Sequence, residues 1–287
     1  MACDTYMTNG KDHIVFLVKQ KQIEELQKTW ALVSGRDIPL EAVYKELTES
    51  MVAIHHSLSI EDFVFPDLVP LQDDLFVLLF WDLFPRANEY GVTQLVVAGI
   101  LIRYCALALD HVFDDDVSIV EYRAFTQYAL LLKCEALKRL QSISGLTHRF
   151  WTEYSRVIVD FIHVAGLDGS QSMGGNQSWD FYETIGKWKS GIQELALFGM
   201  ADIAGDKVPG DLLESLRNYT IGYQIYDDIR DLEKDLVKHN VVLPGIAELF
   251  GRNDVLECVS QNGKLHTLLV KARWYLERAV AFPVGGV

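Results

Sequence analysis

Apolar residues recur three and four positions apart along nearly the whole chain, and the alternation typical of strands is scarce. Because that spacing lines one face of an α-helix, the chain is predicted to be all-α. Only seven prolines interrupt the pattern, which predicts long helices at 12–33, 39–57, 71–84, 91–114, 119–143, 147–166, 178–204, 210–238 and 263–282. We expect them to form one domain over residues 1–287, with flexible tails at 1–11 and 283–287.

Glycine and proline mark the expected breaks between these helices, at Gly35, Pro66, Pro70, Pro85, Gly145, Pro209-Gly210 and Pro244-Gly245. Ser178 is expected to cap the helix that follows it, because its side chain can accept a hydrogen bond from the first turn. The run GLDGSQSMGGNQS, residues 166–178, is the one long candidate loop. Such a loop is more typical of an active-site flap than of a linker.

Composition and charge narrow the classes of partner. Hydrophobic residues make up 49% of the 287 positions, enough for one large core, and the formal net charge is −14. A surface this acidic repels phosphate backbones, so nucleic acid is not an expected partner. A phosphorylated ligand can still bind where metal ions bridge it to the acidic side chains.

The cysteines and the apolar runs predict a cytoplasmic protein without stable membrane insertion. No Cys-x-x-Cys pair occurs among the four cysteines, Cys3, Cys105, Cys134 and Cys258, which indicates reduced thiols. The N-terminal residues lack the basic and apolar regions of a secretory signal. The apolar run 95–109 carries Arg103 and is short for a membrane span.

The densest acidic cluster lies in GYQIYDDIRDLEKDL, residues 222–236. Its Asp227, Asp231 and Asp235 are four residues apart, which places three carboxylates on one helix face, with neighbouring Cβ atoms about 5–6 Å apart. Like charges at this spacing destabilise a helix unless a cation neutralises them, and Mg²⁺ prefers carboxylate and phosphate oxygens. A solvated acidic face is the alternative. The apolar residues that precede the aspartates, within 221–226, argue against full exposure.

A second acidic cluster, ALALDHVFDDD at residues 106–116, repeats this arrangement. Asp110 and Asp114 are again four residues apart after an apolar helix, and Asp115 and Asp116 extend the cluster. If the two helix ends face one another across a bundle, they form a cavity with apolar walls and a charged rim. Metal ions at such a rim can hold a diphosphate, and the walls can hold a hydrocarbon tail.

Short motifs in both regions resemble those of the class I terpenoid synthase superfamily, which includes trans-prenyltransferases, squalene and phytoene synthases, and terpene cyclases. DHVFD (110–114) resembles the first aspartate-rich motif, DDxxD, with His111 in place of the second aspartate. FYETIGKWKSG (181–191) is similar to the prenyltransferase segment that ends in Lys-Thr-Gly, and GYQIYDDIRD (222–231) resembles the second DDxxD. DDIRDLEKD (227–235) also resembles the cyclase pattern NDxxSxxKE, with Asp227 in place of Asn, Asp231 in place of Ser and Asp235 in place of Glu. IRDLEKDLVKHNVVLP (229–244) resembles a run in squalene and phytoene synthases.

The resemblance implies a single-domain helical bundle around a central active-site cavity. Chain elongation requires contacts for isopentenyl diphosphate, but only Arg123 follows the first motif, and FPRANEYG (84–91) contains no Gly-Lys-Arg. The resemblance therefore favours a terpene cyclase, a carbon–oxygen lyase that ionises farnesyl or geranylgeranyl diphosphate, cyclises the cation and releases diphosphate. A trans-prenyltransferase, a head-to-head synthase and a catalytically silent prenyltransferase partner subunit stay open. A homodimer is a further implication of the resemblance.

The same resemblance implies roles for individual residues. Three Mg²⁺ ions are expected on two sets of aspartates, one at Asp110, Asp114 and Asp115 and the other at Asp227, Asp231 and Asp235. The diphosphate is expected to contact Lys189, Gln224, Arg230 and Lys234. Aromatic faces that can stabilise the substrate cation are expected at Phe80, Phe113 and Tyr223.

Structural alternatives exist for several of these roles. Arg230 can form a structural salt bridge, Lys189 can lie on the surface, and His111 can pack locally. Asp228 lies about 100° around the helix from Asp227 and can bond a basic side chain instead of a metal. Aromatic residues at helical spacing more often belong to a core than to a cavity wall.

Overall fold

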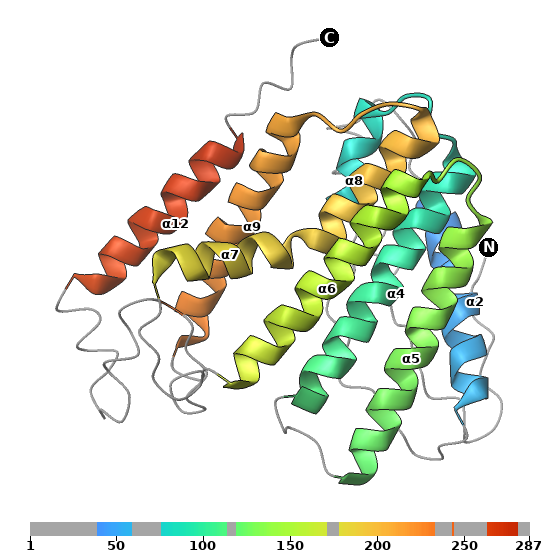
Figure 1. Cartoon of the computed structure of the whole chain (residues 1–287), viewed down its shortest axis with the longest axis horizontal. Helices are drawn as coiled ribbons and strands as arrows, with labels where there is room; N and C mark the ends of the chain where they lie inside the picture. The colour runs from blue at the N-terminus through green and yellow to red at the C-terminus, as the bar shows by residue number, and fades with distance from the viewer. Residues whose placement is uncertain are drawn as a thin grey trace. The chain divides into compact units, whose positions relative to one another are not determined.

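The computed structural model describes residues 39–58, 76–113, 119–170, 178–232, 243 and 263–280. Within these ranges the chain forms α-helices and one 3₁₀ helix, with no strand, so the all-α prediction is confirmed. The expected helix at 12–33 and both expected tails lie outside the described residues. The described elements, drawn in Figure 1, are α2 (Leu40–Ser57), η1 (Phe76–Leu83), α4 (Glu89–Phe113), α5 (Ile119–Ser142), α6 (His148–Ser170), α7 (Trp179–Lys189), α8 (Gly191–Ala204), α9 (Gly210–Arg230) and α12 (Lys264–Val280).

The expected boundaries are close to the observed ones, with four differences. The segment predicted as a helix at 71–84 is described from 76 and is a 3₁₀ helix. α6 continues to Ser170, so the first part of the predicted loop 166–178 is helical. α9 ends at Arg230 and not at 238. The helix predicted at 178–204 is two helices, α7 and α8, which meet at Ser190.

The break at Ser190 has a local cause that periodicity does not reveal. The Ser190 hydroxyl oxygen lies 2.6 Å from the Lys187 carbonyl oxygen and 2.7 Å from Glu194 Oε1. Gly191 follows, and a Cβ added there would lie 3.0 Å from Val157 of α6. A small residue therefore lets α8 begin close against α6. The Ser178 cap is as predicted, since its side chain accepts from the Phe181 backbone N–H.

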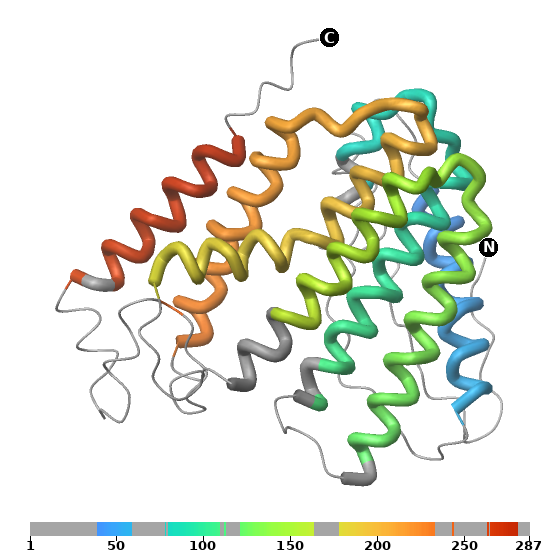
Figure 2. The backbone as a smooth tube through the Cα atoms, viewed as in Figure 1, coloured from blue at the N-terminus to red at the C-terminus, as the bar shows by residue number. Residues whose placement is uncertain are grey.

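The chain separates into two compact units, the first made of Met1–Leu146 with Ile203–Gly205 and the second of Thr147–Asp202 with Asp206–Val287. Figure 2 traces the backbone of both. In the first unit, α4 packs against α5, α2 and η1. The expectation of one terpenoid synthase domain over residues 1–287 stays a prediction.

The central helix of the first unit, α4, is apolar on nearly all sides. Among the described helices it alone is long and apolar enough, over 89–109, to cross a membrane by length and composition. That evidence is weak, because 72% of the stretch is buried inside the protein and a core helix passes the same test.

One buried arginine joins three helices of the first unit. Arg139 of α5 is 8% exposed, and its guanidinium donates to Ser50 Oγ at 2.8 Å and to Glu46 Oε2 at 2.7 Å, both on α2. It also donates to Gln94 Oε1 of α4 at 2.7 Å. A buried charge is tolerated when it is paired and hydrogen-bonded, so this cluster fixes α2, α4 and α5 together.

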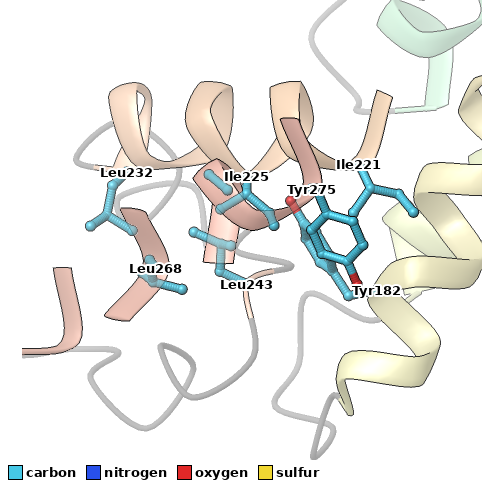
Figure 3. Close-up of a cluster of buried hydrophobic side chains, with 8 residues drawn as sticks. Tyr182, Ile221, Ile225, Leu232, Leu243, Leu268 and Tyr275 are labelled. Atoms are coloured by element: carbon cyan, nitrogen blue, oxygen red, sulfur yellow. The ribbon is translucent and has the colours of Figure 1, made fainter. Parts of the chain in front are cut away.

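In the second unit, α9 packs against α12 and α7, and α7 also contacts α6. Glycines permit the two closest approaches: a Cβ at Gly186 of α7 would lie 2.6 Å from Ile221, and one at Gly222 would lie 2.9 Å from Leu276. The buried side chains between these helices are shown in Figure 3 and comprise Tyr182, Ile221, Ile225, Leu232, Leu243, Leu268, Ala272 and Tyr275.

A fully buried carboxylate organises the polar interior of the second unit. Glu194 of α8 accepts from Arg217 of α9 at 2.7 and 2.9 Å and from Arg156 of α6 at 2.9 Å. Burial by itself would raise the pKa of Glu194, but the hydrogen bonds from Arg217 and Ser190 outweigh it and lower that pKa. Glu194 is therefore a charged group that holds α6, α8 and α9 in place.

Adding one methyl group tests the close packing of α7 on α9. In Gly186→Ala the new Cβ would clash with Ile221, and we expect a net loss of about 1 kcal/mol in unfolding free energy, because overpacking exceeds the gain in helix propensity. Gly99→Ala is the matched control, since no heavy atom lies within 4 Å of its new Cβ, and it should gain up to about 1 kcal/mol. Urea unfolding measures both, and a stabilised Gly186→Ala would contradict the close approach.

Neutralising Glu194 tests the buried cluster. Glu194→Gln keeps the shape but leaves two guanidinium groups without their shared carboxylate, so we expect a loss of about 3–5 kcal/mol in unfolding free energy. The control is Glu277→Gln in α12, which removes an exposed partner of Arg273 and should cost less than about 1 kcal/mol. Urea unfolding measures both variants, and equal losses of unfolding free energy would contradict this role of Glu194.

Candidate functional site

The second aspartate segment lies at the C-terminal end of α9. Asp227 and Asp228 belong to the last turn, and Asp231 is the C-cap, with φ −93° and ψ 4°. The Asp231 N–H donates to the Asp227 carbonyl oxygen at 2.9 Å, so these two residues keep the spacing of one helical turn. Asp235 and Lys234, predicted for the same site, lie outside the described residues.

Three carboxylates are thus gathered at the end of a helix where negative charge is least favourable. The C-terminal end of a helix carries a partial negative charge, and an unfavourable charge there costs typically about 0.3–1 kcal/mol. Arg230 supplies a cation: its Nη2 lies 2.7 Å from Asp227 Oδ1 and its Nε 3.5 Å from Asp231 Oδ1. The negative charge of Asp227 raises the pKa of Arg230, and Asp231 contributes in the same direction. The chain therefore places a cation on this pair of carboxylates.

Asp228 is held differently from its neighbours. Its Oδ2 accepts from the Tyr182 hydroxyl of α7 at 2.8 Å, and its Oδ1 accepts from Gln224 Nε2 at 3.2 Å. Both oxygens are therefore engaged by neutral donors, and Asp228 joins α9 to α7. Gln224, predicted to contact the diphosphate, orients this carboxylate in the structure.

Glu183, the residue after Tyr182, joins α7 to α12. The hydroxyl of Tyr275 donates to Glu183, and Lys271 Nζ lies 3.8 Å from Glu183 Oε1. The same ammonium group lies 4.8 Å from the ring centre of Trp179 and 5.5 Å from that of Tyr275. The contact of Lys271 with Trp179 therefore joins α12 to α7, while the Tyr182–Asp228 bond holds α7 against the aspartate-bearing end of α9.

An exposed aromatic face of α9 leads up to this charged end. Tyr219, Tyr223, Tyr226 and Arg230 follow at i, i+4, i+7 and i+11, which places them on one side of the helix. All three tyrosines are exposed, and the first two stack with ring centres 6.1 Å apart and planes 19° apart. The face extends over roughly 16 Å of helix. One side of α9 therefore offers an aromatic surface that ends in charged groups.

The first aspartate segment ends α4. Asp110 lies in the last turn of that helix, two residues after the buried Ala108, so it follows an apolar stretch as the sequence predicts. The side chains of Asp110, His111 and Phe113 are not among those described, and Asp114 and Asp115 lie outside the described residues. The prediction that they share a metal site stays a prediction.

Of the remaining predicted residues, Lys189 and Phe80 lie on other elements and Tyr223 lies on α9 itself. Lys189 is exposed in the last turn of α7, and Phe80 is partly buried in η1. Tyr223 lies on the exposed face of α9. Sequence reasoning missed Tyr182, Glu183 and Lys271. Helical spacing predicts that Tyr182 is a core residue, but no pattern in the sequence indicates that its hydroxyl reaches Asp228.

Asp227 and Asp231 are the described residues that fit a divalent cation. No group of three or more His, Cys, Asp or Glu side chains arranged for a metal occurs in the described part of the chain. Mg²⁺, however, is usually bound through one or two carboxylates, with phosphate oxygens and water filling its other positions. Their half-exposed oxygens match that donor set, with 39% and 41% of the side chains accessible.

Comparisons with known proteins do not add to this picture. No protein-family model, no curated protein and no solved structure matches the chain.

Changing Tyr182 to phenylalanine tests its bond to Asp228 and gives a characteristic pH dependence. Burial, followed by the Asp228 charge, raises the pKa of Tyr182 far above its ordinary value near 10. Above pH 10 the unfolded chain loses a proton that the native state keeps, so this residue lowers stability by about 1.4 kcal/mol per pH unit. Tyr182→Phe should be about 1 kcal/mol less stable at pH 7, from the lost hydrogen bond, and should match the parent near pH 11.

Urea unfolding at several pH values between about 7 and 11 measures this difference. If the difference in unfolding free energy between variant and parent stays constant across this pH range, the Tyr182 phenol does not keep its proton in the native state.

Proposed function

We propose that the chain is a Mg²⁺-dependent terpene cyclase that ionises an allylic prenyl diphosphate and cyclises the resulting cation. The observation that carries this proposal is the exposed face of α9, on which Tyr219, Tyr223 and Tyr226 lead to Arg230 and the Asp227–Asp231 pair. A ligand that matches such a face has an apolar, unsaturated tail and a strongly anionic head. A prenyl diphosphate has both.

In this mechanism Asp227 and Asp231 would hold the metal ion. Bound Mg²⁺ would neutralise the charge that builds on the departing diphosphate oxygens. The carbon–oxygen bond breaks with its electron pair going to the diphosphate, which leaves an allylic cation. A distant double bond attacks that cation, a new carbon–carbon bond forms, and loss of a proton or addition of water ends the reaction.

The residues of this chain contribute binding, orientation and charge stabilisation. Arg230 is suited to the diphosphate because a guanidinium can donate two parallel hydrogen bonds to phosphate oxygens. The faces of Tyr219 and Tyr223 offer π-electron density to the cation, worth about 0.5–2 kcal/mol per ring according to how dry the site is. Tyr182 and Gln224 hold Asp228 and so fix the turn that carries Asp227.

The test is an incubation of the protein with Mg²⁺ and geranyl, farnesyl or geranylgeranyl diphosphate, each with and without isopentenyl diphosphate. We expect a cyclic hydrocarbon or alcohol from a single allylic diphosphate, detected by gas chromatography–mass spectrometry. Asp227→Asn should reduce its formation by on the order of 100-fold or more, since it removes a metal ligand. Glu214→Gln, which neutralises an exposed carboxylate elsewhere on α9, is the matched control and should stay within about two-fold of the parent.

The other outcomes separate the alternatives. A longer linear alcohol that appears only with isopentenyl diphosphate would make the protein an elongating prenyltransferase. Absence of Mg²⁺-dependent diphosphate release with every substrate would favour a catalytically silent partner subunit.

A further inference from the structure

Arg230 stands between the two carboxylates of the proposed metal site. Its Nη2 is 2.7 Å from Asp227 Oδ1, whereas its Nε is 3.5 Å from Asp231 Oδ1. The guanidinium thus makes one contact to each carboxylate and does not form the two-pronged pair that Arg217 makes with Glu194. Among the described residues these are its two ion pairs, and 57% of its side chain is exposed.

Arg230 and a divalent ion compete for the same carboxylate oxygens. The guanidinium lies against Oδ1 of Asp227 and Oδ1 of Asp231. Mg²⁺ binds oxygens at about 2.0–2.1 Å, so an ion on these two Oδ1 atoms would lie close to the guanidinium. The two positive charges then repel each other, which favours departure of the guanidinium.

We propose that Arg230 is the resident counter-ion of Asp227 and Asp231, that divalent-metal binding displaces it, and that the freed guanidinium then binds the diphosphate. This inference rests on the function proposed above and adds an order to it: metal first, diphosphate second. Arg230 shares its helix face with Tyr223 and Tyr226, so a displaced side chain stays on the side of α9 that carries the aromatic surface.

Exposure makes this exchange easy at Arg230, whereas burial makes it difficult at the Glu194 cluster. The carboxylates that Arg230 contacts are 39% and 41% exposed, so water and salt weaken their attraction for it. Arg156 and Arg217, in contrast, hold a carboxylate that is fully buried. Removing a cation from that site would leave an uncompensated buried charge.

Charge accounts for the coupling between the two ligands. The three carboxylates of this turn, Asp228 included, and one guanidinium sum to −2, which repels a diphosphate. One Mg²⁺ ion raises the sum to 0, and the guanidinium is then no longer held by the aspartates. Metal binding therefore both removes the local negative charge and releases a group with the geometry to bind phosphate.

Isothermal titration calorimetry of Arg230→Gln tests the proposal with two probes. The first probe is Mg²⁺ alone, and the second is inorganic pyrophosphate in excess Mg²⁺. Arg230→Gln should bind Mg²⁺ as well as the parent or up to about five-fold more tightly, since its competitor is gone. It should bind magnesium pyrophosphate at least about ten-fold more weakly, since a charged hydrogen-bond donor is lost. Arg273→Gln, which removes a more exposed i, i+4 ion pair on α12, is the control and should change neither affinity.

Nuclear magnetic resonance of the arginine side chains detects the displacement itself. The Nε–H signal of Arg230 is assigned by its absence from Arg230→Gln. Saturating Mg²⁺ should move or broaden this signal in the parent, while the signal of Arg273 stays in place. In Asp227→Asn, which removes the closer contact, Mg²⁺ should have little effect on it.

Failure of this inference and failure of the proposed function give different results. If Mg²⁺ binds through Asp227 while the Arg230 signal is unchanged, or if Arg230→Gln weakens both ligands equally, the displacement is wrong and the metal site stands. If Mg²⁺ produces no heat and no spectral change in the parent, both the metal site and the role of Arg230 are wrong.

Discussion

The second unit depends on one buried carboxylate and the cations that neutralise it. Taking Glu194 out of water costs several kcal/mol unless its charge is paired and its lone pairs are bonded. Arg156 from α6 and Arg217 from α9 meet this requirement, and their ion pairs with Glu194 hold both helices against α8. The Ser190 hydroxyl completes the set at the junction of α7 and α8. The place where α7 meets α8 is therefore tied to the same charge.

The charges of this protein fall into two kinds that differ in what surrounds them. Glu194 and Arg139 are buried and bonded by several partners, so they specify which helices pack together. The pairs at the end of α9 are half exposed and singly bonded, at the unfavourable end of the helix dipole. Charges of the first kind fix the scaffold. Charges of the second kind can change partners without cost to the fold, as a ligand site requires.

The sequence predicted the helices well because apolar periodicity reports directly which face of a helix is buried. It did not predict the break at Ser190, because a hydroxyl and a glycine at a helix junction leave the three- and four-residue spacing intact. It placed Asp227 and Asp231 one helical turn apart from their spacing, as the structure has them, whereas their role as metal ligands stays a prediction. The hydroxyl of Tyr182 on Asp228 depends on how α7 crosses α9, which is a tertiary feature without a local pattern. The salt bridge of Arg230, in contrast, joins residues one and three positions apart, and it was predicted from the sequence as an alternative.

The apolar surface of α4 has a consequence for how the chain is made. α4 ends at Phe113 and α5, which covers much of it, ends at Ser142, 142 − 113 = 29 residues later. At roughly 5–20 residues per second, synthesis of that stretch takes about 1.5–6 s. During this time α2 and η1 are the neighbours already made among the described elements, and the most apolar helix of the described chain lacks its cover by α5. Yield in the cell should therefore depend on translation rate and on chaperones that shield this segment, and less on the stability of the finished fold.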